Sequence, residues 1–120
     1  HEMVIVFSRN TFIPPHRHDG KSESYQLIAG EMDVFFFDDE GTVSERIEMG
    51  SYESDKTFLY RLSGNIWHMP VPRSKTVVFK ETFCGPFRKA QDVEYAPWAP
   101  GENDEEAILA FLKKIAHHNH

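Results

Sequence analysis

The chain has 120 residues, of which 40% are hydrophobic and 27% charged, and its formal net charge is −6. This length is typical of one domain, and the composition argues against a disordered chain. The negative charge argues against nucleic acid as a partner, and no apolar run approaches the roughly 20 residues of a membrane-spanning helix.

The start of the chain and its cysteine content bear on its compartment. Residues 1–7 contain no basic region and no cleavage site, which argues against secretion. The one cysteine, Cys84, has no partner for a disulfide within the chain, and we interpret it as inert rather than as a nucleophile. We therefore expect a cytoplasmic protein. Because the chain begins at His1 in the approach to a strand, we also expect that upstream sequence is missing.

Most of the chain consists of short stretches of alternating or β-branched and aromatic residues, and each such stretch predicts a strand. Asp38 to Gly41 has the composition of a hairpin turn. Gly30 ends the earlier strand expected at residues 23–29. Many short strands with regular turns favour an all-β barrel or sandwich. Strands are expected at residues 3–7, 11–13, 23–29, 32–37, 43–49, 58–62, 67–71 and 76–83.

The C-terminal part of the chain has a different pattern. Residues 88–101 carry two prolines and are expected to form a loop that wraps the barrel. Asn103, with Glu106 three residues later, resembles a capping box that begins a helix ending near Ile115. We assign residues 1–101 to the barrel with its wrapping loop, 102–116 to a helix packed on the same domain and 117–120 to a tail.

Three consecutive phenylalanines indicate that one strand is covered on both faces. Phe35 and Phe37 share a face, and Phe36 takes the other. One face would line the barrel interior, and the other would pack on a second subunit or on the C-terminal helix. Together with the apolar edge at residues 3–7, this surface predicts a homodimer. The helix itself is too short to be stable alone, so its apolar stripe predicts burial against the outside of the barrel, away from any metal.

The most informative stretch reads His16-x-His18, four residues, Glu23, six residues, Gly30. Histidines at positions i and i+2 of a strand point to the same face. Neutral imidazoles together with a carboxylate bind borderline divalent ions. The Asp19-Gly20 pair allows a turn that would aim Glu23 at an ion held by the two histidines. The spacing therefore predicts a metal site.

This spacing resembles the first motif of the cupin superfamily, and the match from His16 to Gly30 is complete, although Asn10 replaces the leading glycine. The second cupin motif resembles the stretch that ends at His68, where Leu62 replaces the proline and the histidine comes one residue late. More specifically, the chain resembles the WbuC family of cupin-fold metalloproteins. The stretches that carry this resemblance are 14–18 with 21–24, 36–41, 60–62 with 67–68, 80–82 with 85–87, and 96–100.

The resemblance implies a fold, a metal and a biological setting. The fold is the cupin jelly roll, or double-stranded β-helix, with one C-terminal helix. One divalent ion, either Zn, Mn, Fe or Ni, would be bound by His16, His18, Glu23 and His68. For His68, the alternative is a core histidine beside Trp67. The family lies in surface-polysaccharide (O-antigen, capsule) gene neighbourhoods and has no settled reaction.

Two further residues are candidates for proton transfer. Tyr25 shares the face of Glu23 because it lies two residues along the strand. Glu81 lies in an apolar strand, where a carboxylate needs a partner or a function. The competing interpretation of Glu81 is a salt bridge to Arg61 or a solvent-facing position. Basic residues that would hold an anionic substrate, if they are not simply solvated, are Arg61, Arg73 and Lys75.

These features leave several functions open. The first is a metal-dependent isomerase, epimerase or dehydratase (lyase) acting on a small carbohydrate or sugar nucleotide. The second is a non-catalytic sugar-binding or regulatory module that uses the same cavity. An Fe(II) dioxygenase is a third, and a metal-free sugar isomerase with His16 or His68 as its base is a fourth. The intact set of four ligands argues against the metal-free enzyme.

Overall fold

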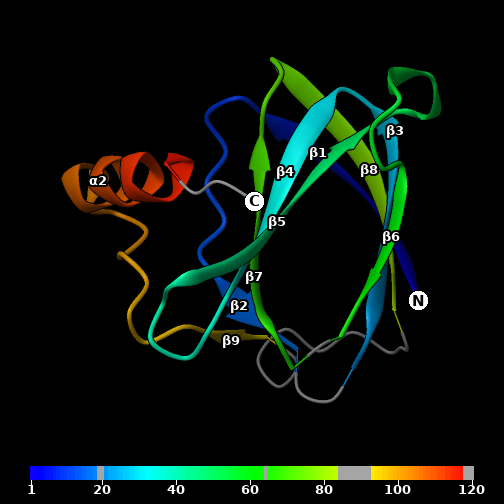
Figure 1. Ribbon diagram of the computed structural model, residues 1–120. Coiled ribbons are helices and arrows are strands. Elements are labelled where there is room, and N and C mark those ends of the chain that lie inside the picture. The colour runs from blue at the N-terminus through cyan, green and yellow to red at the C-terminus, as the bar shows by residue number, and fades with distance from the viewer. Residues whose placement is uncertain (19–20, 64, 84–92, 118–120) are drawn as a thin grey trace.

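The structure, a computed structural model, describes residues 1–18, 21–63, 65–83 and 93–117 (Figure 1). The predictions for Asp19-Gly20, Cys84 and residues 84–92 and 118–120 lie outside these ranges. The elements are β1 (Glu2–Ser8), β2 (His16–Arg17), β3 (Glu23–Ala29), β4 (Glu31–Phe37), β5 (Val43–Gly50), the short 3-10 helix η1 (Tyr52–Ser54), β6 (Leu59–Leu62), β7 (Trp67–Pro72), β8 (Thr76–Phe83), β9 (Glu94–Tyr95) and α2 (Glu105–Ala116).

The strands form two antiparallel sheets that face each other (Figure 1). The first sheet, sheet A, has the order β1-β8-β3-β6, and the second, sheet B, has the order β5-β4-β7-β2-β9. Strands that are distant in sequence are neighbours in both sheets, as in the pairing of β1 with β8 from Glu2 opposite Thr82 to Ser8 opposite Thr76. This arrangement, with one C-terminal helix, confirms the predicted cupin jelly-roll fold.

Alternation along the strands places one apolar set between the sheets. On β4, Met32, Val34 and Phe36 face this interior and are almost fully buried. They meet Val77 and Phe79 from β8 in the opposite sheet. Because successive side chains of a strand point to opposite faces, the intervening residues of β4 must face outward. The side chains of His16 on β2 and His68 on β7 project into the same interior.

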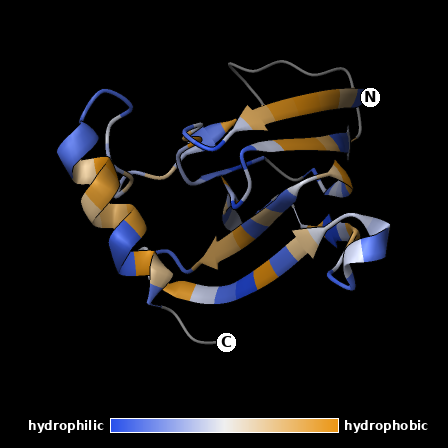
Figure 2. Ribbon diagram, turned by 90° about the horizontal axis from the view of Figure 1, so that it is seen from above, coloured by the Kyte–Doolittle hydropathy of each residue, from blue (hydrophilic) through white to orange (hydrophobic). Residues whose placement is uncertain are grey.

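The outward face of β4 is covered by the chain's own C-terminal segment. Phe35 and Phe37 are fully buried there and form a second apolar cluster with Ile115 of α2. The ring of Trp98, which precedes the helix, lies 5.1 Å from that of Phe37. Phe111 adds a ring contact with Phe37 at 5.9 Å. Figure 2 shows α2 lying beside the barrel with hydrophobic residues along it. The predicted position of the helix on the outside of the barrel is therefore confirmed.

Three local predictions need correction. The helix is capped by Asp104, whose carboxylate accepts a hydrogen bond from the Ala107 amide at 3.1 Å, and not by Asn103. Residues 11–13 form no strand, because Pro14 and Pro15 follow and lack the amide donors that a ladder needs. The predicted wrapping loop contains a short strand, β9, which pairs with β2. Among the described residues, no helix has the length and apolar character needed to cross a membrane.

Candidate metal centre

Two histidines are brought together by strand pairing. His16 on β2 lies directly opposite His68 on β7 in the antiparallel register of sheet B. Both side chains point between the sheets, and their ring centroids are 4.5 Å apart. His68 is fully buried, and His16 is 7% exposed. Trp67 takes the outward face beside Arg17, whose guanidinium carbon lies 4.1 Å from the centre of its indole ring. His68 and Trp67 thus lie on opposite faces of β7 and do not pack on each other.

His18 and Glu23 complete the cluster. His18 lies two residues after His16, and its ring centroid is 5.2 Å from that of His16 and 5.5 Å from that of His68. Glu23 opens β3 in the opposite sheet and is only 1% exposed. Its two carboxylate oxygens lie 2.9 Å from His68 Nε2 and 3.2 Å from His18 Nε2. Two imidazoles from sheet B, those of His16 and His68, and that of His18 directly after β2 therefore gather beside one carboxylate from sheet A, which contacts His18 and His68.

The backbone orients two of the imidazoles. Nδ1 of His16 lies 2.9 Å from the carbonyl oxygen of Pro14, and Nδ1 of His68 lies 2.8 Å from that of Ile66. A carbonyl accepts hydrogen bonds only, so Nδ1 of each ring carries a proton and the Nε2 atoms face the interior. Burial, together with the positive charge that His68 can carry, lowers the pKa of His16 to about 3. His16 is therefore neutral at pH 7, which is the form that binds metal.

Glu23 is held as a carboxylate by its neighbours. Burial alone would raise the pKa of Glu23, but hydrogen bonds from His18, His68 and Glu81 outweigh it and hold that pKa well below its usual range. The negative charge is therefore present in the interior at neutral pH. No lysine or arginine of the described residues forms an ion pair with it. Its polar contacts are two imidazoles, a second carboxyl group and the hydroxyl of Tyr25.

That second carboxyl group belongs to Glu81 on β8. Burial and the adjacent charge and hydrogen bond of Glu23 raise the pKa of Glu81 to about 9, so Glu81 carries the proton of the pair at neutral pH. The expected alternative, a salt bridge to Arg61 or a solvent-facing position, is wrong. Arg61 instead donates to the Ser22 hydroxyl at 2.8 Å. Parity with Phe79 and Phe83, which both face inward, is the sequence feature that indicates this orientation.

Tyr25 lies beside the carboxyl pair and borders a cavity. It pairs directly with Glu81 across β3 and β8 and is 2% exposed. Burial and the nearby charge of Glu23 raise the pKa of Tyr25 well above its usual value, so its hydroxyl keeps its proton. The cavity measures about 210 Å³ and has His16, Tyr25 and Glu81 among its lining residues. Its apolar lining, which the motif analysis did not identify, consists of Ile5, Phe7, Ile13, Pro70 and Phe79.

The donor atoms fit a metal ion. The ligand atoms of His16, His18 and His68 all lie within 4.8 Å of one another, and so do those of His18, Glu23 and Glu81. Imidazole nitrogen with carboxylate oxygen is the donor set of zinc and of other first-row divalent ions. The Nε2 atom of His18 lies 3.2 Å from the Oε2 atom of Glu23, and both residues are buried. Such a convergence of acceptor atoms in a buried place is what a cation requires.

The basic residues proposed for an anionic substrate do not join this cavity. Arg73 lies on the outer side of sheet B, where its Nε donates to Asp33 at 2.6 Å. Arg61, Arg73 and Lys75 are all exposed, and none lines the cavity described above.

Comparison with known proteins supports the fold. A family model described as "Domain of unknown function (DUF6016)" matches residues 1–49, which is less than half of the chain. No curated protein matches the sequence. Among solved structures, the chain resembles the TDP-quinovose 3,4-ketoisomerase of Campylobacter jejuni with 14% identity and a TM-score of 0.63, over 78% of this chain and 68% of that one.

Two further solved structures show the same likeness. A dTDP sugar isomerase from Desulfovibrio desulfuricans matches with 14% identity and a TM-score of 0.64, over 90% of this chain and 68% of that one. A 4-keto-6-deoxy sugar epimerase from the novobiocin gene cluster of Streptomyces spheroides matches with 17% identity and a TM-score of 0.61, over 79% and 50% of the two chains. At these identities the likeness defines the fold alone: the chain is a cupin-fold protein whose structural neighbours include sugar-nucleotide isomerases and epimerases.

Proposed function

We propose that this protein is a metal-dependent cupin enzyme that isomerises, epimerises or dehydrates a small carbohydrate or sugar nucleotide. We place it with the WbuC family, in surface-polysaccharide biosynthesis, on the resemblance of its motifs. The observation that carries the proposal is the meeting of three imidazoles and a carboxylate with a protonated carboxyl group at one end of a cavity. The sugar isomerases and epimerases among the structural neighbours support the class of substrate.

In this proposal, His16, His18, His68 and Glu23 hold one divalent ion. When bound, the ion would act as a Lewis acid toward a hydroxyl or carbonyl oxygen of the substrate. The carbonyls of Pro14 and Ile66 keep the Nε2 atoms of His16 and His68 aimed at the site. Such outer partners orient the ligands and fix their tautomers. Zinc, manganese, iron and nickel all suit this donor set, and a cytoplasmic location suits a chain with a single cysteine.

Glu81 would transfer a proton in the reaction, and Tyr25 would orient the substrate. Isomerisation or epimerisation next to a carbonyl moves a proton between carbon and oxygen, and a buried carboxyl group with a raised pKa is suited to deliver it. Glu81 lines the cavity, so it can reach a ligand there. Tyr25 stays protonated and would donate a hydrogen bond that orients the substrate oxygen. Ile5, Phe7 and Phe79, which also line the cavity, would keep water away from the substrate.

The test is turnover of a panel of sugars and nucleotide sugars by the metal-loaded protein, followed by NMR in D₂O. Solvent deuterium should appear on a substrate carbon with the wild-type protein, and incorporation should fall at least about a hundredfold in Glu81→Gln. The exposed carboxylate variant Glu45→Gln is the matched control and should keep full exchange. Saturable binding without exchange for every sugar would instead identify a non-catalytic sugar-binding module.

We also propose that the protein is a homodimer. The triple phenylalanine strand no longer supports this, because α2 covers Phe35 and Phe37 within the same chain. The remaining support is the outer face of sheet A, where Val4 and Val6 on the edge strand β1 are each 64% exposed and Ile28 is 50% exposed. Light scattering at micromolar concentration should give twice the chain mass of 13.9 kDa. A monomer mass would refute this assembly, and Val6→Lys should produce monomers if the face is the interface.

A further inference from the structure

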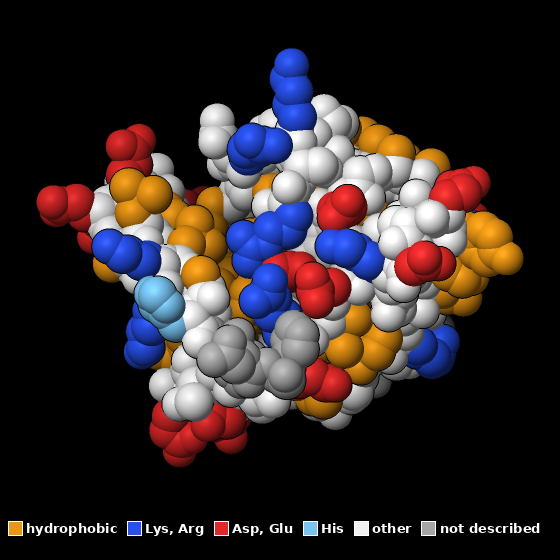
Figure 3. All heavy atoms as spheres, turned by 45° about the horizontal axis from the view of Figure 1, so that its top comes forward, with side chains coloured by type: hydrophobic (Ala, Val, Ile, Leu, Met, Phe, Trp, Pro, Cys, Tyr) orange, Lys and Arg blue, Asp and Glu red, His pale blue; other side chains and the backbone are white. Residues whose placement is uncertain are grey.

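A second hollow lies on the outside of the barrel, on the face opposite to the metal cluster. It measures about 370 Å³ and runs between β7 and α2. This is within the range of small-molecule sites. We call it the helix groove. Figure 3 shows hydrophobic side chains along the seam beside the helix and basic side chains next to them on the barrel. The residues that line the helix groove are Arg9, Val71, Pro72, Arg73, Leu112 and Ile115.

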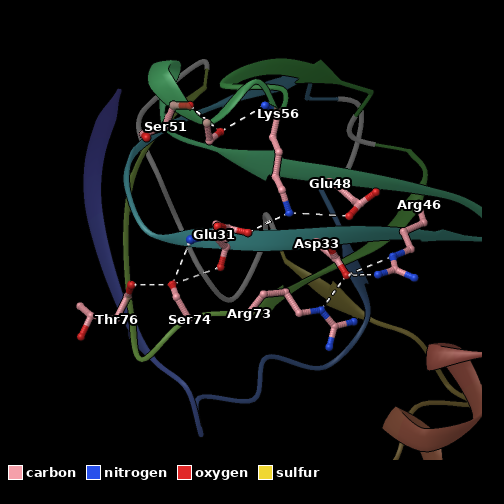
Figure 4. Close-up of polar contacts among 10 residues, drawn as sticks. Glu31, Asp33, Arg46, Glu48, Ser51, Lys56, Arg73, Ser74 and Thr76 are labelled. Atoms are coloured by element: carbon pink, nitrogen blue, oxygen red, sulfur yellow. Dashed lines mark hydrogen bonds and ion pairs between the residues drawn. The ribbon is translucent and has the colours of Figure 1, made fainter.

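Arg73, one of the two basic residues that line the helix groove, is held in place by the buried carboxylate of Asp33. Asp33 on β4 is 2% exposed, and its Oδ2 accepts hydrogen bonds from Arg73 Nε at 2.6 Å and from Arg46 Nε at 3.0 Å. Figure 4 shows Asp33 between these two arginines. Both guanidinium carbons also lie near the buried Phe35 ring, at 5.6 Å for Arg46 and 5.9 Å for Arg73. A guanidinium fixed through Nε keeps its outer N–H groups available for another acceptor.

The charges around Arg73 do not balance. One buried carboxylate serves two arginines, so this cluster keeps a net positive charge. Arg9, across the groove, is exposed, and its guanidinium makes no hydrogen bond or ion pair with any described residue. The nearby acids Glu31 and Glu48 are engaged by Lys56 at 2.8 and 3.7 Å. None of the residues that line the helix groove is acidic. A cationic site therefore stands out on a chain whose net charge is −6.

We propose that the helix groove binds a small amphipathic carboxylate, with its charge between Arg73 and Arg9 and its aliphatic chain on Val71, Leu112 and Ile115. Arginine presents paired N–H groups that match a carboxylate, and such charge-assisted bonds are among the strong ones. The apolar floor adds affinity only for a ligand that carries an aliphatic chain. The site is separate from the metal centre and does not depend on the carbohydrate function.

The test uses octanoate as the probe and the methyl NMR signals of the full-length protein as the readout. Octanoate should shift the methyl signals of Val71, Leu112 and Ile115 in a saturable manner and leave those of Val34 and Val77 inside the barrel unchanged. 1-Octanol, which lacks the charge, and acetate, which lacks the chain, should each bind at least about tenfold more weakly. Shifts centred on Ile5 and Ile13 instead would place the ligand in the barrel cavity and overturn the proposal.

Three arginine variants locate the charge. Arg73→Gln should weaken octanoate binding about tenfold, and Arg9→Gln should weaken it several-fold. Arg46→Gln is the comparison variant: Arg46 shares Asp33 but does not line the groove, so its loss should weaken octanoate binding less than the loss of Arg73 does. Arg9 makes no ion pair with Asp33, so its variant keeps the test valid if Arg73→Gln fails to fold. Equal affinity in wild type and Arg9→Gln, or no saturation by about 10 mM octanoate, would refute the site.

Discussion

Two carboxylates are buried to the same degree in this protein, and they are neutralised in different ways. Glu23 in the barrel interior is 1% exposed, and Asp33 on the outer face of sheet B is 2% exposed. Asp33 forms ion pairs with Arg46 and Arg73 at 2.8 and 2.6 Å. Glu23 contacts the imidazoles of His18 and His68. The first carboxylate has permanent cations beside it, whereas the second has imidazoles, which in their neutral form are metal ligands.

This difference separates a structural carboxylate from one prepared for a ligand. Arginine stays protonated at all relevant pH values, so Asp33 needs nothing from outside the chain. A histidine offers a lone pair once its proton is gone, and a metal ion can then replace the proton as the positive charge. His16, whose pKa is lowered to about 3, is already in that form. In the proposed function, the interior of the barrel is therefore the place where an external cation would complete the electrostatics.

The largest expected effect comes from exchanging the two carboxylates for amides. Saturating metal should raise the free energy of unfolding of the wild type by about 4 kcal/mol when the free metal is about a thousandfold above its Kd. Glu23→Gln should abolish most of this rise. Asp33→Asn should keep the rise but lower the free energy of unfolding without metal by about 2 kcal/mol, because it leaves two partly exposed arginines without their carboxylate. Urea unfolding with and without Zn²⁺ measures both values, and a retained metal effect in Glu23→Gln would contradict the comparison.

A smaller effect is expected from removing one imidazole. His68→Ala should weaken metal affinity at least about a hundredfold, because it deletes a ligand that the backbone holds in position. His117→Ala, at the exposed end of α2, is the matched control and should bind as the wild type does. Metal content of the purified variants by mass spectrometry checks this. Unchanged metal content in His68→Ala would show that His68 is not a ligand of the site.

A third expected effect is a dependence of stability on pH in the metal-free protein. The pKa of His16 is about 3 in the folded state and about 6.5 in the unfolded state, so only the unfolded chain binds this proton between those values. Stability should therefore be full above about pH 6.5 and fall as the pH drops toward 3, by up to about 1.4 kcal/mol per pH unit. Urea unfolding from pH 7 to pH 4 measures the slope. An equal slope in His16→Gln would show that His16 is not its source.

Local spacing was enough to predict much of the fold and the gathering of residues at the candidate metal centre. The His16-x-His18 pair and Glu23 are close in sequence, and strand parity alone sends them inward. The same parity separates Phe36 from Phe35 and Phe37, which the structure places on opposite faces. Predictions that rest on alternation within one strand therefore agree with the structure.

Features that depend on pairing between distant segments were not predictable in this way. The contact of Glu81 with Glu23 requires the register of β3 against β8, in which Tyr25 faces Glu81. The strand β9 exists only because it pairs with β2, which is far away in sequence. The predicted strand at 11–13 fails because Pro14 and Pro15 postpone the pairing to His16. In each case the missing information is which strand lies beside which.

The most direct test of the central claim is anomalous X-ray scattering from crystals of the protein grown with Zn²⁺. We predict one strong peak inside the barrel, about 2.0–2.2 Å from the Nε2 atoms of His16, His18 and His68 and from a carboxylate oxygen of Glu23. The same crystals should show no peak beside Asp33, whose oxygens are taken by arginines. An interior without a peak at saturating Zn²⁺, or a peak held only by exposed carboxylates, would contradict the assignment of Glu23 as the carboxylate that awaits a cation.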